Sequence, residues 1–62
     1  MENHFKEKVA IVTGGGSGIG KAACMIFSKK GAKVVVVDIN PDSGNETVAE
    51  IESKGGEAVF LQ

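Results

Sequence analysis

Five glycines within seven residues constrain this chain more than any other feature of its sequence: residues 14–20 read GGGSGIG. The run before them, residues 8–13, is short, apolar and rich in β-branched side chains, which is typical of a buried strand. Residues 21–30 carry apolar side chains at helical spacing and are followed by Gly31, a common helix stop. The pattern predicts a strand, a turn over residues 14–20 and a helix over residues 21–30.

The second half of the chain repeats this alternation. Residues 32–38 contain four consecutive valines, which indicates a parallel strand covered on both faces. Asn40 followed by Pro41 supplies a helix cap and a proline at the first helical position. We expect the buried stripe of this second helix to comprise Gly44, Val48, Ile51 and Gly55.

Residues 57–62 predict a third strand, so the element order is β-α-β-α-β. Right-handed crossovers place both helices on the same face of a parallel sheet and leave the opposite face bare. In a doubly wound α/β fold, the second half of the domain covers that face. We therefore expect residues 1–62 to be the N-terminal part of a single domain whose remainder is absent, and to fold poorly alone, since ordering each residue costs roughly 1.5 kcal/mol.

Composition excludes several classes of protein. With 42% hydrophobic residues, 24% charged residues and a net charge of -1, the chain is neither disordered nor suited to nucleic acid. Its longest aliphatic runs, residues 9–12 and 34–37, fall far short of the roughly 20 residues that span a membrane. The first eight residues are polar and charged rather than signal-like, so we expect a cytoplasmic protein. Cys24 is the single cysteine and gives no basis for a disulfide or a metal site.

The position of the glycine-rich segment, between a strand and a helix, suits it to bind phosphate. A helix start presents unpaired backbone N–H groups and the positive end of the helix dipole, and glycines let a pyrophosphate approach closely. The dinucleotide pattern G-x-G-x-x-G does not fit, because Ile19 stands where its last glycine is required. The pattern T-G-x-x-x-G-x-G fits at every defined position from Thr13 to Gly20.

In this pattern and in its element order, the chain resembles the short-chain dehydrogenase/reductase family. The resemblance implies a Rossmann-type fold, specifically the N-terminal β-α-β-α-β portion of a doubly wound parallel sheet. It also implies an NAD-binding segment of an oxidoreductase that transfers hydride between a nicotinamide cofactor and an alcohol or carbonyl substrate. The cofactor-binding residues that it implies are Gly14, Gly16, Ser17, Gly18, Ile19, Asp38 and Ile39.

Asp38 follows Gly20 by 18 residues, at the end of the second predicted strand. An acid at this place in a dinucleotide-binding unit accepts hydrogen bonds from the adenosine ribose, although an aspartate there would also suit a simple turn. Family members that use NADP tend to carry a basic residue at the positions of Ser17 or Ile39. NAD is therefore the expected cofactor rather than NADP.

Two alternatives remain. Residues 15–21 also spell G-x-x-x-x-G-K, the start of a phosphate-binding P-loop, but Ala22 follows where Mg²⁺ requires a hydroxyl. A free-standing nucleotide-binding module without catalysis is the second alternative. The family uses a tyrosine beside a lysine for catalysis, and this chain has no tyrosine, so we assign it no catalytic residue and no metal site. The resemblance further implies a small-molecule substrate, no nucleic-acid or membrane partner, and a homo-oligomeric parent enzyme.

Overall fold

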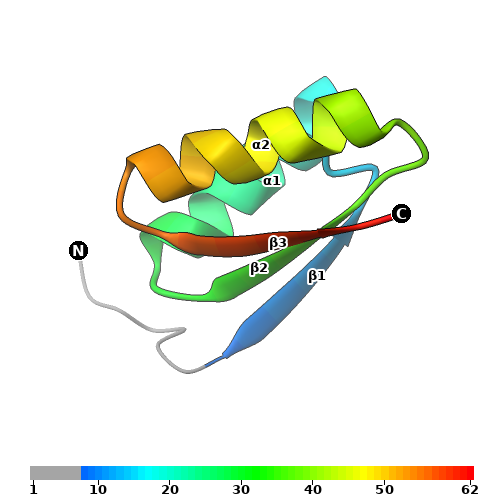
Figure 1. Cartoon of the computed structure of the whole chain (residues 1–62). Coiled ribbons are helices and arrows are strands. Elements are labelled where there is room, and N and C mark those ends of the chain that lie inside the picture. The colour runs from blue at the N-terminus through cyan, green and yellow to red at the C-terminus, as the bar shows by residue number, and fades with distance from the viewer. Residues whose placement is uncertain (1–7) are drawn as a thin grey trace.

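Three strands and two helices alternate along the chain (Figure 1). In the computed structural model, which describes residues 8–62, the β-α-β-α-β order predicted from the sequence is confirmed. Residues 1–7, most of the segment that argued against a secretory signal, lie outside the described range. The elements are β1 (Val9–Thr13), α1 (Gly18–Lys29), β2 (Lys33–Val37), α2 (Pro41–Ser53) and β3 (Glu57–Leu61).

The sheet is parallel, in the order β1-β2-β3, with β2 at its centre. The strands are in close register, since Val37, the last residue of β2, lies between Thr13 of β1 and Leu61 of β3. All three carboxyl ends therefore meet at one edge of the sheet. The segments that leave β1 and β2 start side by side at this edge.

Both helices cover the same face of the sheet, as the sequence predicted (Figure 1). Alternate valines of β2 point into the core under the helices, where Val34 is 1% exposed and Val36 is fully buried beside Cys24 and Ile51. No helix of the described residues covers the other face, on which Ile11 of β1 is 69% exposed and Leu61 of β3 is 59% exposed. Within residues 8–62 this face of the sheet is bare, as the sequence predicted.

Helix α1 begins at Gly18, three residues earlier than the sequence predicted. The reason is the cap: the Ser17 hydroxyl accepts a hydrogen bond from the Gly20 amide at 3.2 Å, which stabilises the first helical turn although that turn holds two glycines. The turn proper is therefore residues 14–17. The predicted stop is confirmed, because Gly31 follows the helix with φ +99°.

Helix α2 begins where the sequence predicted. The Asn40 side-chain oxygen accepts hydrogen bonds from the amides of Asp42 and Ser43 at 3.0 and 3.2 Å. The predicted buried stripe is correct in part: Gly44 and Ile51 are buried and Val48 is partly buried, but Gly55 lies beyond the end of the helix. Thr47 is the buried residue that the sequence interpretation passed over.

Neither helix of residues 8–62 is long and apolar enough to cross a membrane.

The contact between α2 and β3 yields a test of the packing. A Cβ atom added at Gly44 would overlap the ring of Phe60. We expect Gly44→Ala to lower the free energy of unfolding by about 1–3 kcal/mol, because overpacking forces the ring or the helix to move. Ala49→Ser adds an atom on the exposed side of the same helix and should change stability by less than about 0.7 kcal/mol. Urea unfolding of the complete protein measures both, and equal effects would contradict the close packing of α2 on Phe60.

Candidate functional site

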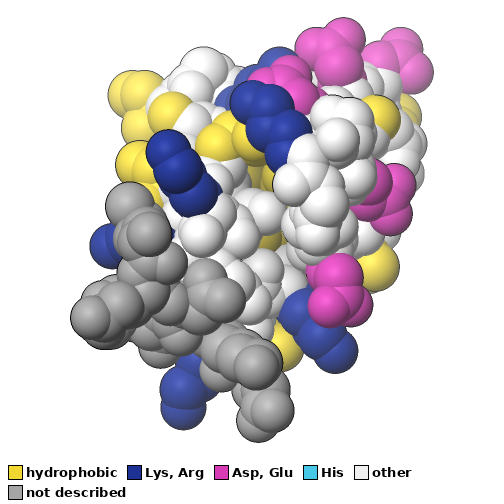
Figure 2. All heavy atoms as spheres, turned by 90° about the vertical axis from the view of Figure 1, so that its left-hand side faces the viewer, with side chains coloured by type: hydrophobic (Ala, Val, Ile, Leu, Met, Phe, Trp, Pro, Cys, Tyr) yellow, Lys and Arg dark blue, Asp and Glu magenta, His cyan; other side chains and the backbone are white. Residues whose placement is uncertain are grey.

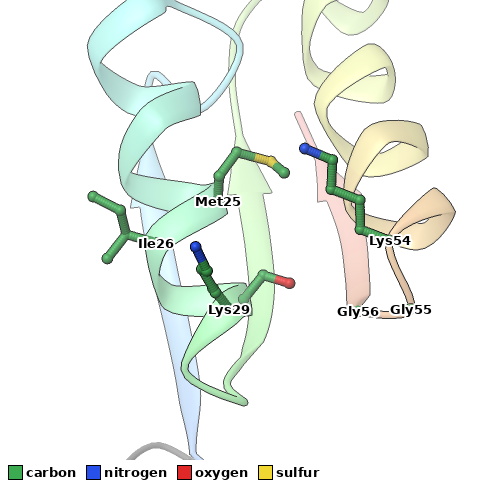
Figure 3. Close-up of a pocket in the computed structure, with 7 residues that line it drawn as sticks. Met25, Ile26, Lys29, Lys54, Gly55 and Gly56 are labelled. Atoms are coloured by element: carbon green, nitrogen blue, oxygen red, sulfur yellow. The ribbon is translucent and has the colours of Figure 1, made fainter. Parts of the chain in front are cut away.

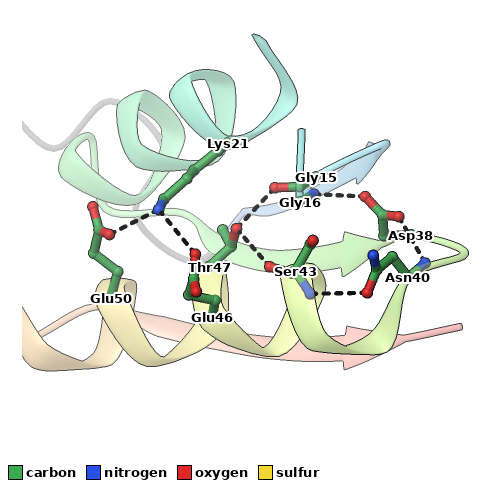
Figure 4. A network of polar contacts seen from close by, with 9 residues as sticks. All are labelled: Gly15, Gly16, Lys21, Asp38, Asn40, Ser43, Glu46, Thr47 and Glu50. Atoms are coloured by element: carbon green, nitrogen blue, oxygen red, sulfur yellow. Dashed lines mark hydrogen bonds and ion pairs between the residues drawn. The ribbon is translucent and has the colours of Figure 1, made fainter. Parts of the chain in front are cut away.

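The turn after β1 and the segment after β2 meet at the carboxyl edge of the sheet. Residues 14–17 lead into α1, and residues 38–40 lead into α2. Figure 4 shows Gly15 and Gly16 of the first segment beside Asp38 of the second. In open α/β sheets, ligands bind outside the carboxyl ends of the strands. The sequence-predicted site residues come from these two segments and the start of α1, so the fold gathers them in one place.

The glycine turn is closed by Gly14 and Ser17. Gly14 has φ +66°, a left-handed conformation that favours glycine, and its carbonyl accepts hydrogen bonds from the Ser17 amide at 3.0 Å and the Ser17 hydroxyl at 2.7 Å. The same hydroxyl caps α1 by accepting from the Gly20 amide. The Ser17 side chain therefore already holds the turn and the helix start together.

Two backbone amides at the start of α1 are free. Within residues 8–62, the N–H groups of Gly18 and Ile19 have no acceptor, whereas the amides of Gly16 and Gly20 are bonded to the side chains of Asp38 and Ser17. Unpaired amides at a helix N-terminus, together with the positive end of the dipole, form a site for an anion. The start of α1 presents two such amides.

The glycines of this segment divide into two kinds. A Cβ at Gly15 would lie 2.7 Å from Cγ1 of Val36, one at Gly16 would lie 2.6 Å from the Cβ of Ser43, and one at Gly20 would overlap the Gly14 carbonyl. A Cβ at Gly18 would meet nothing within 4 Å. Packing therefore requires Gly15, Gly16 and Gly20, while Gly18 leaves open space beside the free amides.

Asp38 holds the two segments together through its carboxylate. Oδ2 accepts a hydrogen bond from the Gly16 amide and Oδ1 accepts one from the Asn40 amide, both at 2.8 Å (Figure 4). These amides, that of Asn40 first, lower the pKa of Asp38 below its usual value because they stabilise the charged form. Each carboxylate oxygen has a second lone pair, so Asp38 is an ionised acceptor that can still bind a hydroxyl.

Exposed apolar side chains flank this carboxylate and these amides. Ile39 is 92% exposed and Ile19 is 89% exposed, more than any other large hydrophobic residue of the described range. Ile39 lies in the segment after β2, and Ile19 lies in the first turn of α1. Apolar side chains held in the open beside polar groups are typical of a ligand site.

Thr47 of α2 also contacts the turn, and the sequence interpretation missed it. Its side chain is fully buried, and its hydroxyl lies 3.0 Å from the Gly15 carbonyl and 3.3 Å from the Ser43 carbonyl. One signal was available, because Thr47 lies three residues after Gly44 and four before Ile51 on the buried stripe. Thr47 was missed because threonine is polar and the stripe was identified from apolar residues and glycine.

The two helices are joined by an ion pair near this point. Nζ of Lys21 lies 3.0 Å from Oε1 of Glu50 and 3.9 Å from Oε1 of Glu46 (Figure 4). The hydrogen bond and the opposite charge raise the pKa of Lys21 and lower that of Glu50. Both side chains are partly exposed, so this pair is a modest tie between α1 and α2.

A hollow of about 580 Å³ lies at the opposite end of the molecule, between the last turns of the helices (Figure 3). Figure 2 views this end, where lysine side chains and hydrophobic groups lie at the surface. Met25 lines the hollow from α1, and Lys29 and Lys54 flank it near the helix ends. Because it lies away from the carboxyl edge and the free amides, it is not the candidate site.

Catalytic and metal-binding groups were not assigned from the sequence. Within residues 8–62, no three His, Cys, Asp or Glu side chains are grouped so that they could hold a metal ion. Cys24 is buried in the core, and burial raises the pKa of its thiol.

Known proteins are similar in sequence to this chain. A family model described as short chain dehydrogenase matches residues 8–62. An uncharacterized oxidoreductase of Thermotoga maritima is 52% identical over 58 residues, which cover 94% of this chain and 23% of the relative. The 2,5-dichloro-2,5-cyclohexadiene-1,4-diol dehydrogenase LinX of Sphingobium indicum is 45% identical over 62 residues, covering 100% of this chain and 25% of the relative.

A solved structure agrees with these relatives. The crystal structure of hydroxysteroid dehydrogenase from Escherichia coli superposes with a TM-score of 0.89 and 46% identity, covering 94% of this chain and 25% of that one. This match confirms the Rossmann-type α/β fold predicted from the sequence. The chain spans about a quarter of the length of these three proteins.

The low pKa of Asp38 predicts a pH dependence. A carboxylate whose pKa is lower in the folded state stabilises the fold above its unfolded pKa of about 4, and this stabilisation is lost as the pH falls through the folded value. We therefore expect Asp38→Asn to destabilise the complete protein at pH 7, and the difference from the unmodified protein to shrink below about pH 4. Urea unfolding at pH values from 7 to 3 measures this. A difference that does not vary with pH would contradict the role of the charge.

Proposed function

Because the chain belongs to the short-chain dehydrogenase family, we propose that its described residues hold the adenosine diphosphate part of NAD in a dehydrogenase. Residues 1–62 would then be the N-terminal part of one dinucleotide-binding domain. The observation that carries this proposal is the pairing of two free amides at the start of α1 with an ionised carboxylate at the end of β2.

The pyrophosphate fits the start of α1. The amides of Gly18 and Ile19 would donate to its oxygens, and the absence of a side chain at Gly18 would let it approach. Gly14, Gly16 and Ser17 would shape this surface rather than supply its free donors. The Gly16 amide is bonded to Asp38, and the amide and hydroxyl of Ser17 are bonded to the Gly14 carbonyl.

The adenosine fits the end of β2. Asp38 would accept hydrogen bonds from the ribose hydroxyls, and the exposed side chain of Ile39 would offer an apolar surface to the adenine. A 2′-phosphate would meet the charge of Asp38, and neither Ser17 nor Ile39 offers a cation. These features favour NAD over NADP.

NAD, when bound, accepts a hydride and its reduced form donates one, so the complete protein would oxidise an alcohol to a carbonyl compound or catalyse the reverse reduction. Two of the related proteins are named for a diol and a hydroxysteroid, which supports a small-molecule alcohol as the substrate. Residues 8–62 would contribute binding and orientation to this reaction. The homo-oligomeric state and the cytoplasmic location expected from the sequence stay predictions.

Glycine replacements test the pyrophosphate site. We expect Gly18→Ala to leave the stability of the complete protein unchanged and to weaken NAD binding, because its new methyl group would enter only the open space beside the free amides. Gly20→Ala is the matched control, since its methyl group would overlap the Gly14 carbonyl and should lower stability by about 1–3 kcal/mol or more.

Calorimetric titration with NAD and thermal unfolding measure these two effects. Titration of the unmodified protein with Mg-ATP tests the P-loop alternative, which Ala22 disfavours because it has no oxygen for the metal. Unchanged NAD affinity in Gly18→Ala would contradict the proposed pyrophosphate site. Binding of Mg-ATP without NAD would overturn the proposed function.

Asp38 should decide the choice of cofactor. Two unit charges about 4 Å apart interact by about 1 kcal/mol in water and about 4 kcal/mol near a protein surface, so discrimination against NADP on the order of a hundredfold is expected. Asp38→Ala should lose much of the preference for NAD over NADP. The double variant Asp38→Ala/Ile39→Arg should shift the preference further towards NADP, because the arginine would pair with the 2′-phosphate.

Steady-state kinetics of the complete enzyme with both cofactors measures the ratio of specificity constants. Asp42→Ala, which removes an exposed carboxylate from the first turn of α2, serves as the control and should leave the ratio unchanged. If the unmodified enzyme prefers NADP, or if Asp38→Ala keeps its ratio, Asp38 is not the ribose ligand.

A further inference from the structure

Thr47 is the one fully buried polar side chain within residues 8–62. Its hydroxyl has a single proton and lies near two carbonyls, those of Gly15 at 3.0 Å and Ser43 at 3.3 Å. The contact with Ser43 is the ordinary bond of a threonine to its own helix. The contact with Gly15 spans 32 residues and links α2 to the glycine turn.

The peptide unit between Gly15 and Gly16 is held at both ends. Its carbonyl, that of Gly15, accepts from Thr47, and its N–H, that of Gly16, donates to Oδ2 of Asp38 at 2.8 Å (Figure 4). A peptide unit is planar and rotates as one body, so turning it would break both hydrogen bonds.

These hydrogen bonds matter more here than at an ordinary residue. Glycine permits many backbone conformations, so two successive glycines do not fix the orientation of the peptide between them. Side chains at either position are excluded by the contacts with Val36 and Ser43. The orientation of this peptide must therefore be set by its hydrogen-bond partners, Thr47 and Asp38.

We infer that Thr47 is a positioning residue for cofactor specificity, which it exerts through the Gly15–Gly16 peptide on the carboxylate of Asp38. This inference rests on the proposed binding of NAD. Thr47 is buried and would not touch the cofactor. Without its hydroxyl the peptide loses one of its two hydrogen bonds and can turn, which weakens the bond from the Gly16 amide to Oδ2. The carboxylate then keeps only the bond from the Asn40 amide and is less well aligned with the ribose.

The effect is selective for NAD. The ribose of NAD would use the aligned carboxylate, whereas NADP carries a phosphate that the carboxylate repels. Loss of alignment should therefore weaken NAD without weakening NADP. A loss of packing alone would weaken both cofactors to the same extent.

Titration of the complete protein with NAD and with NADP tests this. Thr47→Val keeps the size of the side chain and removes the hydroxyl, and it should weaken NAD binding roughly three- to tenfold, the effect of one lost hydrogen bond. The dissociation constant for NADP should stay within about twofold, so the NAD preference falls. Thr47→Ser keeps the hydroxyl and should retain the preference.

Further variants cover the case in which Thr47→Val does not fold. Thr47→Ala and Thr47→Ser both remove the methyl group, and only Thr47→Ala should lower the NAD preference. Ser53→Ala removes a hydroxyl that donates to the Glu50 carbonyl on the same helix, away from the turn, and should change neither affinity. In an Asp38→Ala background, Thr47→Val should no longer alter the preference.

The outcomes separate this inference from the function on which it rests. Suppose that the unmodified protein binds NAD and that Thr47→Val folds. If this variant keeps the NAD preference, or loses affinity for NAD and NADP to the same extent, Thr47 only fills space and the inference is wrong. If Thr47→Val still changes the NAD preference in the Asp38→Ala background, Thr47 does not act through Asp38. If the unmodified protein binds no NAD, the proposed function fails and this role fails with it.

Discussion

The hydrogen bond from the Gly16 amide to the Asp38 carboxylate connects the two halves of the site. It joins residues 22 positions apart in sequence, one from the turn after β1 and one from the end of β2. The parallel register makes it possible, because both strands end at the same edge of the sheet. This contact holds the glycine turn beside Asp38 and, together with the Asn40 amide, lowers the pKa of that carboxyl.

A turn held so closely can contain only small residues. Packing excludes side chains at Gly15, Gly16 and Gly20, which lie against Val36, Ser43 and the Gly14 carbonyl. Gly18 is different, because no atom of the chain fills the space beside it. The glycines therefore meet two separate requirements. The fold needs close contact at three of them, and the candidate site needs open space at the fourth.

Helix α2 takes part in the site as well as covering the sheet. Asn40 caps it, and the Asn40 amide also donates to Asp38, so the cap and the carboxylate share one short segment. Further along, Thr47 reaches the Gly15 carbonyl, and Glu50 pairs with Lys21 of α1. Glu50 therefore pairs across the helices, because the approach of α1 supplies the lysine at 3.0 Å.

The sequence by itself determined the elements, their order and the general place of the site. The valine run, the Asn40-Pro41 cap and the glycine-rich turn are local signals, because a strand period, a cap and a turn depend on residues close together in the chain. The same signals located Asp38 after the second strand. The start of α1 was placed three residues late, because glycines in its first turn concealed the Ser17 cap.

Only the tertiary structure decided which groups are engaged and which are free. The Gly16 amide is taken by Asp38 and the Gly15 carbonyl by Thr47, while the Gly18 amide is unbonded within residues 8–62. No local pattern encodes this division, since each partner lies on another element and more than 20 residues away. Hydrogen bonding at the site depends on how β2 and α2 pack beside the turn, and packing is a property of the whole fold.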